Sequence, residues 1–168
     1  MDNVLGVGPG FTDRLSSTLR DRQGLAYTVR ASISDSAGIQ PGTFTGYIGT
    51  FPDKYVWVRE GFLKEINRIR DEAATKTEVE DAKKYLTGSL AFTLTSNESI
   101  AGTLLAIERY KLGFDFLAKY KAKIEAVTVE DVQKAAKKHL DPKKLTIAVC
   151  GPIGTDGLPL KKTDDKDK

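Results

Sequence analysis

The sequence predicts an α+β domain, in which an antiparallel sheet has helices packed on one of its faces. Residues 25–34 and 43–50 alternate apolar and polar side chains, which is the period of a strand. From residue 54 to residue 140, apolar side chains instead recur every three or four positions, as in amphipathic helices. Because strands and helices are separated along the chain, we expect an α+β arrangement rather than an alternating α/β fold.

A short helix and the strand after it come first. Thr12 is a suitable N-cap, and Leu15 and Leu19 lie four positions apart on one helical face. Gly24 is well placed to end this helix, because glycine readily takes the left-handed conformation found at such ends. In the following strand, the odd-numbered residues from 25 to 33 are predicted to point to one face.

Arg20 and Tyr27 are the candidate functional residues. Arg20 lies near the end of the predicted helix and Tyr27 near the start of the predicted strand. A tight turn between the two elements could direct both side chains into one space. The residue types also allow a purely structural interpretation, in which Tyr27 is a core residue and Arg20 stabilises the helix C-terminus.

A hairpin and a first long helix follow. Turn-forming residues at 35–42 connect the first strand to a second strand at Thr43–Thr50, as in an antiparallel hairpin. From Lys54 onward the apolar residues follow helical spacing. Trp57 lies beside this apolar stripe, and we expect it to fill the core or an interface.

Further helices and one last strand complete the predicted elements. A capping box at Thr77–Glu80 starts one helix, and Thr128–Asp131 caps the last one. Between them, apolar residues predict two helices, around 100–112 and 116–124. The alternation of Lys144–Cys150 predicts a closing strand, in which Cys150 should be a small buried residue.

Composition and residue counts exclude several classes of function. The chain has 168 residues, of which 40% are hydrophobic, as expected for one domain with a core. Its 26 basic and 23 acidic residues are too balanced to indicate a nucleic-acid partner, and no apolar run approaches the ~18 residues of a membrane span. The single histidine, His139, cannot supply a two-histidine zinc motif, and we expect it to interact with a helix C-terminus.

Residues 1–152 are expected to form the domain and residues 153–168 a disordered polar tail, because 161–168 contains no apolar residue. Only three strands are evident before that tail. The face of a three-stranded sheet is too small for this many helices to pack on. We therefore expect at least one strand to come from residues outside this chain.

Several short motifs occur in an order that indicates a family. They are Phe11-Thr12-x-Arg14-Leu15, Leu19-Arg20, Gly24-Leu25-Ala26-Tyr27, Gly42-Thr43-Phe44, Thr77-Glu78-x-Glu80 and Leu140-Asp141-Pro142. Together they resemble the pitrilysin/insulinase-type zinc metallopeptidases, the inverzincins. The likeness covers about residues 3–152.

The resemblance implies a division of labour between two halves that close like a clam shell around a peptide. In this family, the N-terminal half binds zinc through a His-x-x-Glu-His motif, and the C-terminal half contributes an arginine and a tyrosine seven positions apart. Arg20 and Tyr27 have that spacing, so the chain resembles the C-terminal, non-zinc-binding type. The two side chains would then bind substrate carbonyl oxygens and the developing oxyanion. Zinc would be held by the other half and none by this chain, which would be inactive alone.

The resemblance also implies partners. These are the zinc-binding N-terminal half, fused or separate, and a peptide substrate. The family domain opens with a strand and a helix, and Met1–Gly6 looks like the end of that helix, so the first strand and most of the helix are expected to be lacking. An unpaired sheet edge would also make self-association possible. The alternative is a non-proteolytic scaffold subunit of the same fold, although a scaffold need not keep the arginine–tyrosine pair.

Overall fold

A computed structural model shows that the chain has the α+β architecture, and it describes residues 1–154, 156 and 158–160. A two-stranded antiparallel sheet is formed by β1 (Ala26–Ser32) and β2 (Thr45–Thr50). The helices are the single-turn α1 (Asp2–Leu5) and the longer η2 (Ser16–Arg22), α2 (Tyr55–Asp71), α3 (Lys76–Ser89), α4 (Asn97–Arg109), α5 (Phe116–Glu125) and α6 (Val129–His139). Short 3-10 turns occupy Pro9–Phe11, Ser34–Ser36, Pro52–Lys54, Leu90–Leu94 and Pro142–Lys144.

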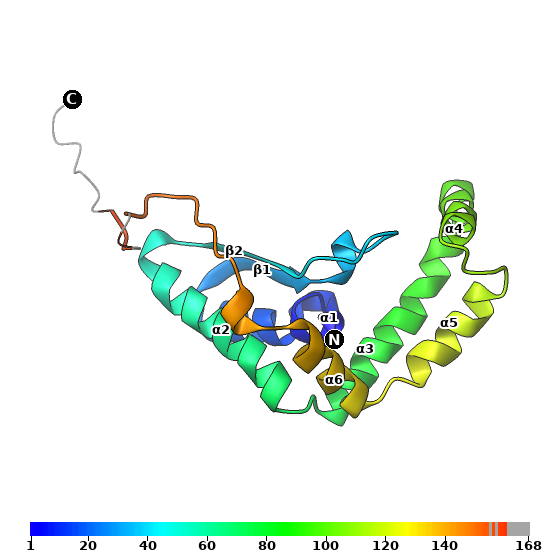
Figure 1. Cartoon of the computed structure of the whole chain (residues 1–168), viewed down its shortest axis with the longest axis horizontal. Helices are drawn as coiled ribbons and strands as arrows, with labels where there is room; N and C mark the ends of the chain where they lie inside the picture. Colours follow the sequence, from blue (N-terminus) through cyan, green and yellow to red (C-terminus); the bar gives the residue numbers. More distant parts are fainter. Residues whose placement is uncertain (155, 157, 161–168) are drawn as a thin grey trace.

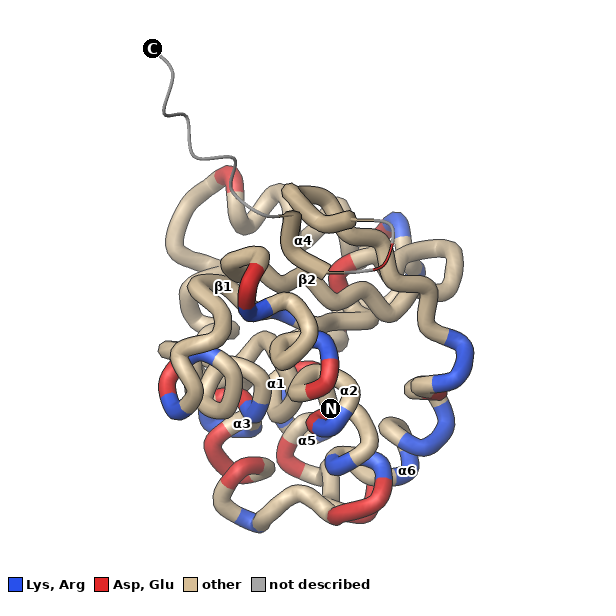
Figure 2. Tube along the Cα trace, turned by 90° about the vertical axis from the view of Figure 1, so that its left-hand side faces the viewer, with Lys and Arg blue, Asp and Glu red and all other residues tan. Residues whose placement is uncertain are grey.

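Helices cover one face of the sheet. Figure 1 shows β1 and β2 above α1, η2 and α2, with α6 packed below, while α3, α4 and α5 extend away as a separate arm. The core lies between the sheet and the first group of helices, where Leu5, Leu19 and Ile66 are fully buried. Charged residues gather on the helical side, and most of the strand trace is uncharged (Figure 2). In the described part of the chain, no helix is long and apolar enough to cross a membrane.

The long helix α2 lies directly beneath β2. Its apolar stripe is buried as predicted, with Val58, Phe62, Ile66 and Ile69 all under a tenth exposed. The contact with the sheet is so close that a Cβ added to Gly46 would lie 2.4 Å from Cζ of Phe62. Trp57 is different, because its side chain is 60% exposed and does not fill the core.

Two helix caps differ from the prediction by one or two residues. The segment before η2 is capped by Asp13 instead of Thr12: Asp13 accepts hydrogen bonds from the Ser16 amide and the Ser16 hydroxyl, both at 2.9 Å. The capping box of α3 uses Thr75 with Glu78, so the helix begins two residues earlier than Thr77 implied. In both cases a second suitable capping residue lies close by in the sequence.

The predicted closing strand at 144–150 has no pairing partner in the described residues. The segment belongs to no sheet, and the side chains of Ile147 and Val149 are about half exposed. Cys150 is exposed, so the prediction of a buried cysteine is wrong. Alternation predicts an extended backbone, but strand pairing and burial need a neighbouring strand and a covering layer.

The structure at the two ends of the chain can be compared with the predicted helix end and the predicted polar tail. Met1–Gly6 was expected to be the end of a helix, and α1 is a single helical turn there. In the expected tail, Ile153 and Pro159 form an isolated antiparallel bridge. Residues 155, 157 and 161–168 of that expected tail lie outside the described residues.

Candidate functional site

The turn that joins η2 to β1 is held by hydrogen bonds from several elements. Gly24 has φ of +57°, the left-handed conformation predicted for the residue that ends the helix. The Leu25 amide donates to the Leu19 carbonyl at 2.8 Å, and Nζ of Lys54 donates to the Gly24 carbonyl at 2.8 Å. The hydroxyl of Thr50 donates to the Leu25 carbonyl. Residues on either side of this turn are therefore presented from a fixed backbone.

Arg20, on the helical side of the turn, is held against an aromatic ring. Its guanidinium carbon lies 3.7 Å from the ring centroid of Phe11, and its Nη1 lies 3.8 Å from Oδ1 of Asp21. Phe11 has φ of +63°, an uncommon conformation for a residue with a side chain, and this conformation is often found at functional sites. Sequence reasoning did not identify Phe11 as a site residue, because its conformation has no signature in the local pattern.

Tyr27, on the strand side of the turn, points to solvent. Its side chain is 84% exposed, whereas Ala26, Val29 and Ala31 are buried. The pairing of β1 with β2 is shifted here, because Ala26 pairs with Thr50 and Thr28 pairs with Gly49. Tyr27 is thus the extra residue of a β-bulge. The prediction that it shares a face with Val29 and Ala31 is wrong, because the bulge interrupts the alternation.

The structure places Arg20 and Tyr27 at the two ends of one turn. Within the described residues, no hydrogen bond or cation–π contact joins the two side chains. Arg20 is about a third exposed and Tyr27 almost fully exposed, so both can be reached from solvent. Their chemistry is that of a fixed cation with several N–H donors and a free phenol, both suited to carbonyl oxygens.

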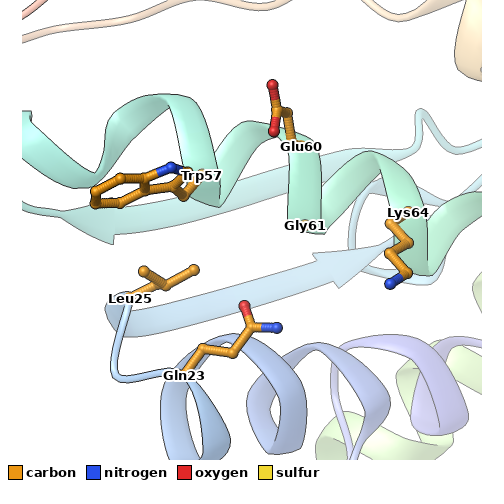
Figure 3. A pocket seen from close by; sticks show the side chains of 6 residues that line it. All are labelled: Gln23, Leu25, Trp57, Glu60, Gly61 and Lys64. Carbon is orange, nitrogen blue, oxygen red and sulfur yellow. The ribbon is translucent and has the colours of Figure 1, made fainter.

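A cavity of about 540 Å³ lies between the same turn and helix α2 (Figure 3). Trp57 and Leu25 form its apolar wall, and the Gln23 side chain points towards Gly61. A Cβ at Gly61 would lie 2.5 Å from Cδ2 of Leu19, so the absence of a side chain there lets α2 approach η2 closely. The cavity is therefore bounded by two elements that are packed together.

A buried ion pair fixes the start of the segment that carries Arg20. The Arg14 side chain is 5% exposed, and its Nε and Nη2 donate to the two carboxylate oxygens of Glu78 at 2.7 and 2.9 Å. Partial burial alone would raise the pKa of Glu78, but the hydrogen bonds from Arg14 and from the Thr75 amide outweigh it and lower the pKa to about 2. The pair connects Arg14, two residues before η2, to Glu78 on α3, 64 positions further along the chain.

The residues that the structure describes do not fit a zinc site. Across residues 1–154, 156 and 158–160, no three His, Cys, Asp or Glu side chains gather as metal ligands would. His139 lies at the last position of α6 and is exposed. A catalytic zinc site normally takes three protein ligands, so no chemical step of this chain is assigned to a metal.

Comparison with known proteins identifies a matching family model and several related sequences. The family model described as the peptidase M16 inactive domain matches residues 1–86. Proteins named uncharacterized zinc protease in Mycobacterium bovis and Mycobacterium tuberculosis are 28% identical over 149 residues, which is 89% of this chain and 33% of theirs. A Helicobacter pylori protein named non-peptidase homolog YmxG is 27% identical over 148 residues, which is 85% of this chain and 33% of its own.

Solved structures show the same likeness. The peptidase M16 inactive domain from Pseudomonas fluorescens superposes with a TM-score of 0.71 at 29% identity, covering 85% of this chain and 33% of that one. A protease from Helicobacter pylori has the same fold, with a TM-score of 0.70 at 18% identity, covering 85% of this chain and 33% of its own. The chain therefore spans about a third of the length of the relatives it matches.

Proposed function

The chain belongs to the family of the peptidase M16 inactive domain, and on that premise we propose that it binds the polypeptide substrate of a zinc-dependent endopeptidase. In this proposal, Arg20 and Tyr27 contact the substrate. Zinc is held by an N-terminal half, which is either fused to this chain or a separate subunit. The relatives named zinc proteases are about three times as long as the matched region, which leaves room for such a half.

The observation that supports the proposal most strongly is the β-bulge at Tyr27. Without the bulge, strand alternation would direct this side chain to the face on which Val29 and Ala31 are buried. With the bulge, a phenol is 84% exposed next to a fixed turn. Bulges of this kind often redirect a side chain beside an active site.

The position of Arg20 supports the same proposal. Stacking on Phe11 restricts the guanidinium, and its shortest contact with Asp21 is long, at 3.8 Å. Among the described residues no group accepts a hydrogen bond from its N–H groups, which leaves them available to a substrate carbonyl oxygen. Arginine keeps its charge over the working pH range and holds its donors in a rigid plane, so it can stabilise negative charge that develops on that oxygen.

The test is peptide cleavage by this chain together with its zinc-binding half. We expect Arg20→Ala and Tyr27→Phe each to lower kcat/KM by about a hundredfold, the usual effect of removing one oxyanion donor. Arg20→Lys should recover only part of the activity, because lysine keeps the charge but not the planar donors. Arg22→Ala is the matched control, since Arg22 is exposed two positions from Arg20. Wild-type kcat/KM in both folded variants would exclude the proposed roles.

A scaffold subunit without proteolytic activity is the second candidate. It is favoured by one observation, that the Helicobacter pylori relative at 27% identity is named a non-peptidase homolog. A scaffold would not depend on Arg20 or Tyr27. Two results together would favour this second function. The wild-type complex would cleave no peptide, and both variants would still assemble into that complex.

A further inference from the structure

A second cavity lies on the sheet, three positions along β1 from Tyr27. It has a volume of about 250 Å³ and is lined by Arg30, Asp35, Ser36, Thr43 and Tyr47 among others. Pockets for whole small-molecule ligands usually measure ~300–1,000 Å³, so this cavity suits a single side chain. At about 3.3 Å per residue, Arg30 lies roughly 10 Å from Tyr27 along the strand, a distance that three residues of extended peptide also span.

The cavity lies along the same pair of strands as Tyr27. Arg30 and Tyr47 are cross-strand partners in the register of β1 and β2. The phenol oxygen of Tyr47 lies 3.7 Å from where a Cβ on Gly49 would be, and Gly49 is in turn the partner of Thr28, the residue after Tyr27. The Tyr47 ring, 62% exposed, therefore extends along the open face of the sheet from the cavity towards the bulge.

Some polar atoms of the cavity are hydrogen-bonded to one another, and others have no partner in the part of the chain that the structure describes. The Ser36 hydroxyl donates to the Thr43 carbonyl at 3.1 Å and accepts from the Thr43 amide at 2.7 Å. Arg30 Nε and Nη2 both donate to the same oxygen, Oδ2 of Asp35, at 3.0 and 2.6 Å. Among the described residues, Nη1 of Arg30 and Oδ1 of Asp35 form no hydrogen bond. The same ion pair therefore leaves one guanidinium nitrogen and one carboxylate oxygen without a hydrogen-bond partner among the described residues.

We infer, building on the proposed function, that this cavity is a subsite for one substrate side chain and that it selects an uncharged carboxamide, that of glutamine or asparagine. A carboxamide can accept from a free N–H of Arg30 through its oxygen and donate to Asp35 Oδ1 through its nitrogen. A carboxylate would be attracted by Arg30 but repelled by Asp35, and an ammonium group would be attracted by Asp35 but repelled by Arg30, so neither charged group gains what the neutral carboxamide does. The methylene groups of a glutamine side chain pack against the Tyr47 ring.

The experiment measures binding of four blocked pentapeptides, Ala-Ala-Xaa-Ala-Ala with Xaa as Gln, Glu, Lys or Leu, to the ¹⁵N-labelled full chain by NMR titration. We expect the Gln peptide to bind about fivefold more tightly than the others, the size of effect that one exposed polar contact gives. Its binding should move the backbone amide signals of Arg30, Asp35 and Tyr47. Equal affinities, or no binding by any of the four peptides, would overturn the inference.

Two charge-removing variants make the test specific. Asp35→Asn leaves Arg30 as the only charge and should transfer the preference to the Glu peptide. Arg30→Gln leaves Asp35 and should transfer it to the Lys peptide. Asp81→Asn, which removes one partner of an exposed ion pair with Lys84 on α3, is the matched control and should keep the preference for Gln. A variant that weakens all four peptides equally would indicate a structural effect and overturn the assignment.

The outcomes separate this inference from the proposed function. If Arg20 and Tyr27 variants lose cleavage while the four peptides bind alike, only the subsite is wrong. If the Gln preference and its two switches hold while Arg20 and Tyr27 variants cleave normally, the subsite stands and the roles of Arg20 and Tyr27 are wrong.

Discussion

Replacement of Glu78 by glutamine tests the ion pair that holds the segment just before η2 against α3. The Glu78 side chain is 28% exposed and Arg14 only 5%, so Glu78→Gln leaves a nearly buried guanidinium without its counter-charge. The fall in the pKa of Glu78 from 4.5 to about 2 corresponds to about 3 kcal/mol of stability at neutral pH. Loss of one partner of a buried pair typically costs ~3–5 kcal/mol, which is the same size.

The sign of the pH dependence follows from the direction of this pKa. Because the folded-state pKa lies below the unfolded value, the stabilisation is complete above about pH 4.5 and is lost as the pH falls towards 2. In urea unfolding at pH 7, we expect the variant to be about 3 kcal/mol less stable than wild type. At pH 3 the gap should shrink by about 2 kcal/mol, because part of the wild-type advantage has already been lost.

Glu80→Gln is the control for this prediction. Glu80 lies on the same helix and pairs with Lys83, but its side chain is 44% exposed, so its loss should cost less than about 1 kcal/mol. Thermal unfolding gives a second readout, in which Glu78→Gln should lower Tm by roughly 6–12 °C. A stability gap that is the same at pH 7 and pH 3 would refute the reasoning, since the variant would then be acting through packing and not through charge.

Two further predictions concern the packing of the sheet and the segment 145–150. Gly46→Ala should destabilise the chain by about 1–3 kcal/mol in urea unfolding, because the new Cβ would lie 2.4 Å from Phe62. Gly49→Ala is its matched control, with 3.7 Å to the nearest atom, and an equal loss in both variants would contradict the packing argument. Cys150 is exposed and should react with a thiol reagent as fast in the folded chain as in urea; strong protection would show that the 145–150 segment is covered.

Local signals determined much of this protein. Caps and stops follow from neighbouring residues, so the Thr128–Asp131 capping box and the left-handed Gly24 were both predicted and both found. The apolar stripe of α2 was predicted for the same reason, since helical period depends on residues three and four apart. The seven-residue spacing of Arg20 and Tyr27 is likewise a property of the sequence itself.

Tertiary structure decided where these groups point and what they contact. The bulge that turns Tyr27 to solvent arises from the register between β1 and β2, and register depends on two segments that are distant in sequence. The Arg14–Glu78 pair joins residues 64 positions apart. The cavity around Arg30 exists only because Tyr47 lies opposite it across the sheet. Contacts of this kind join residues that are far apart in the sequence, so no local pattern records them.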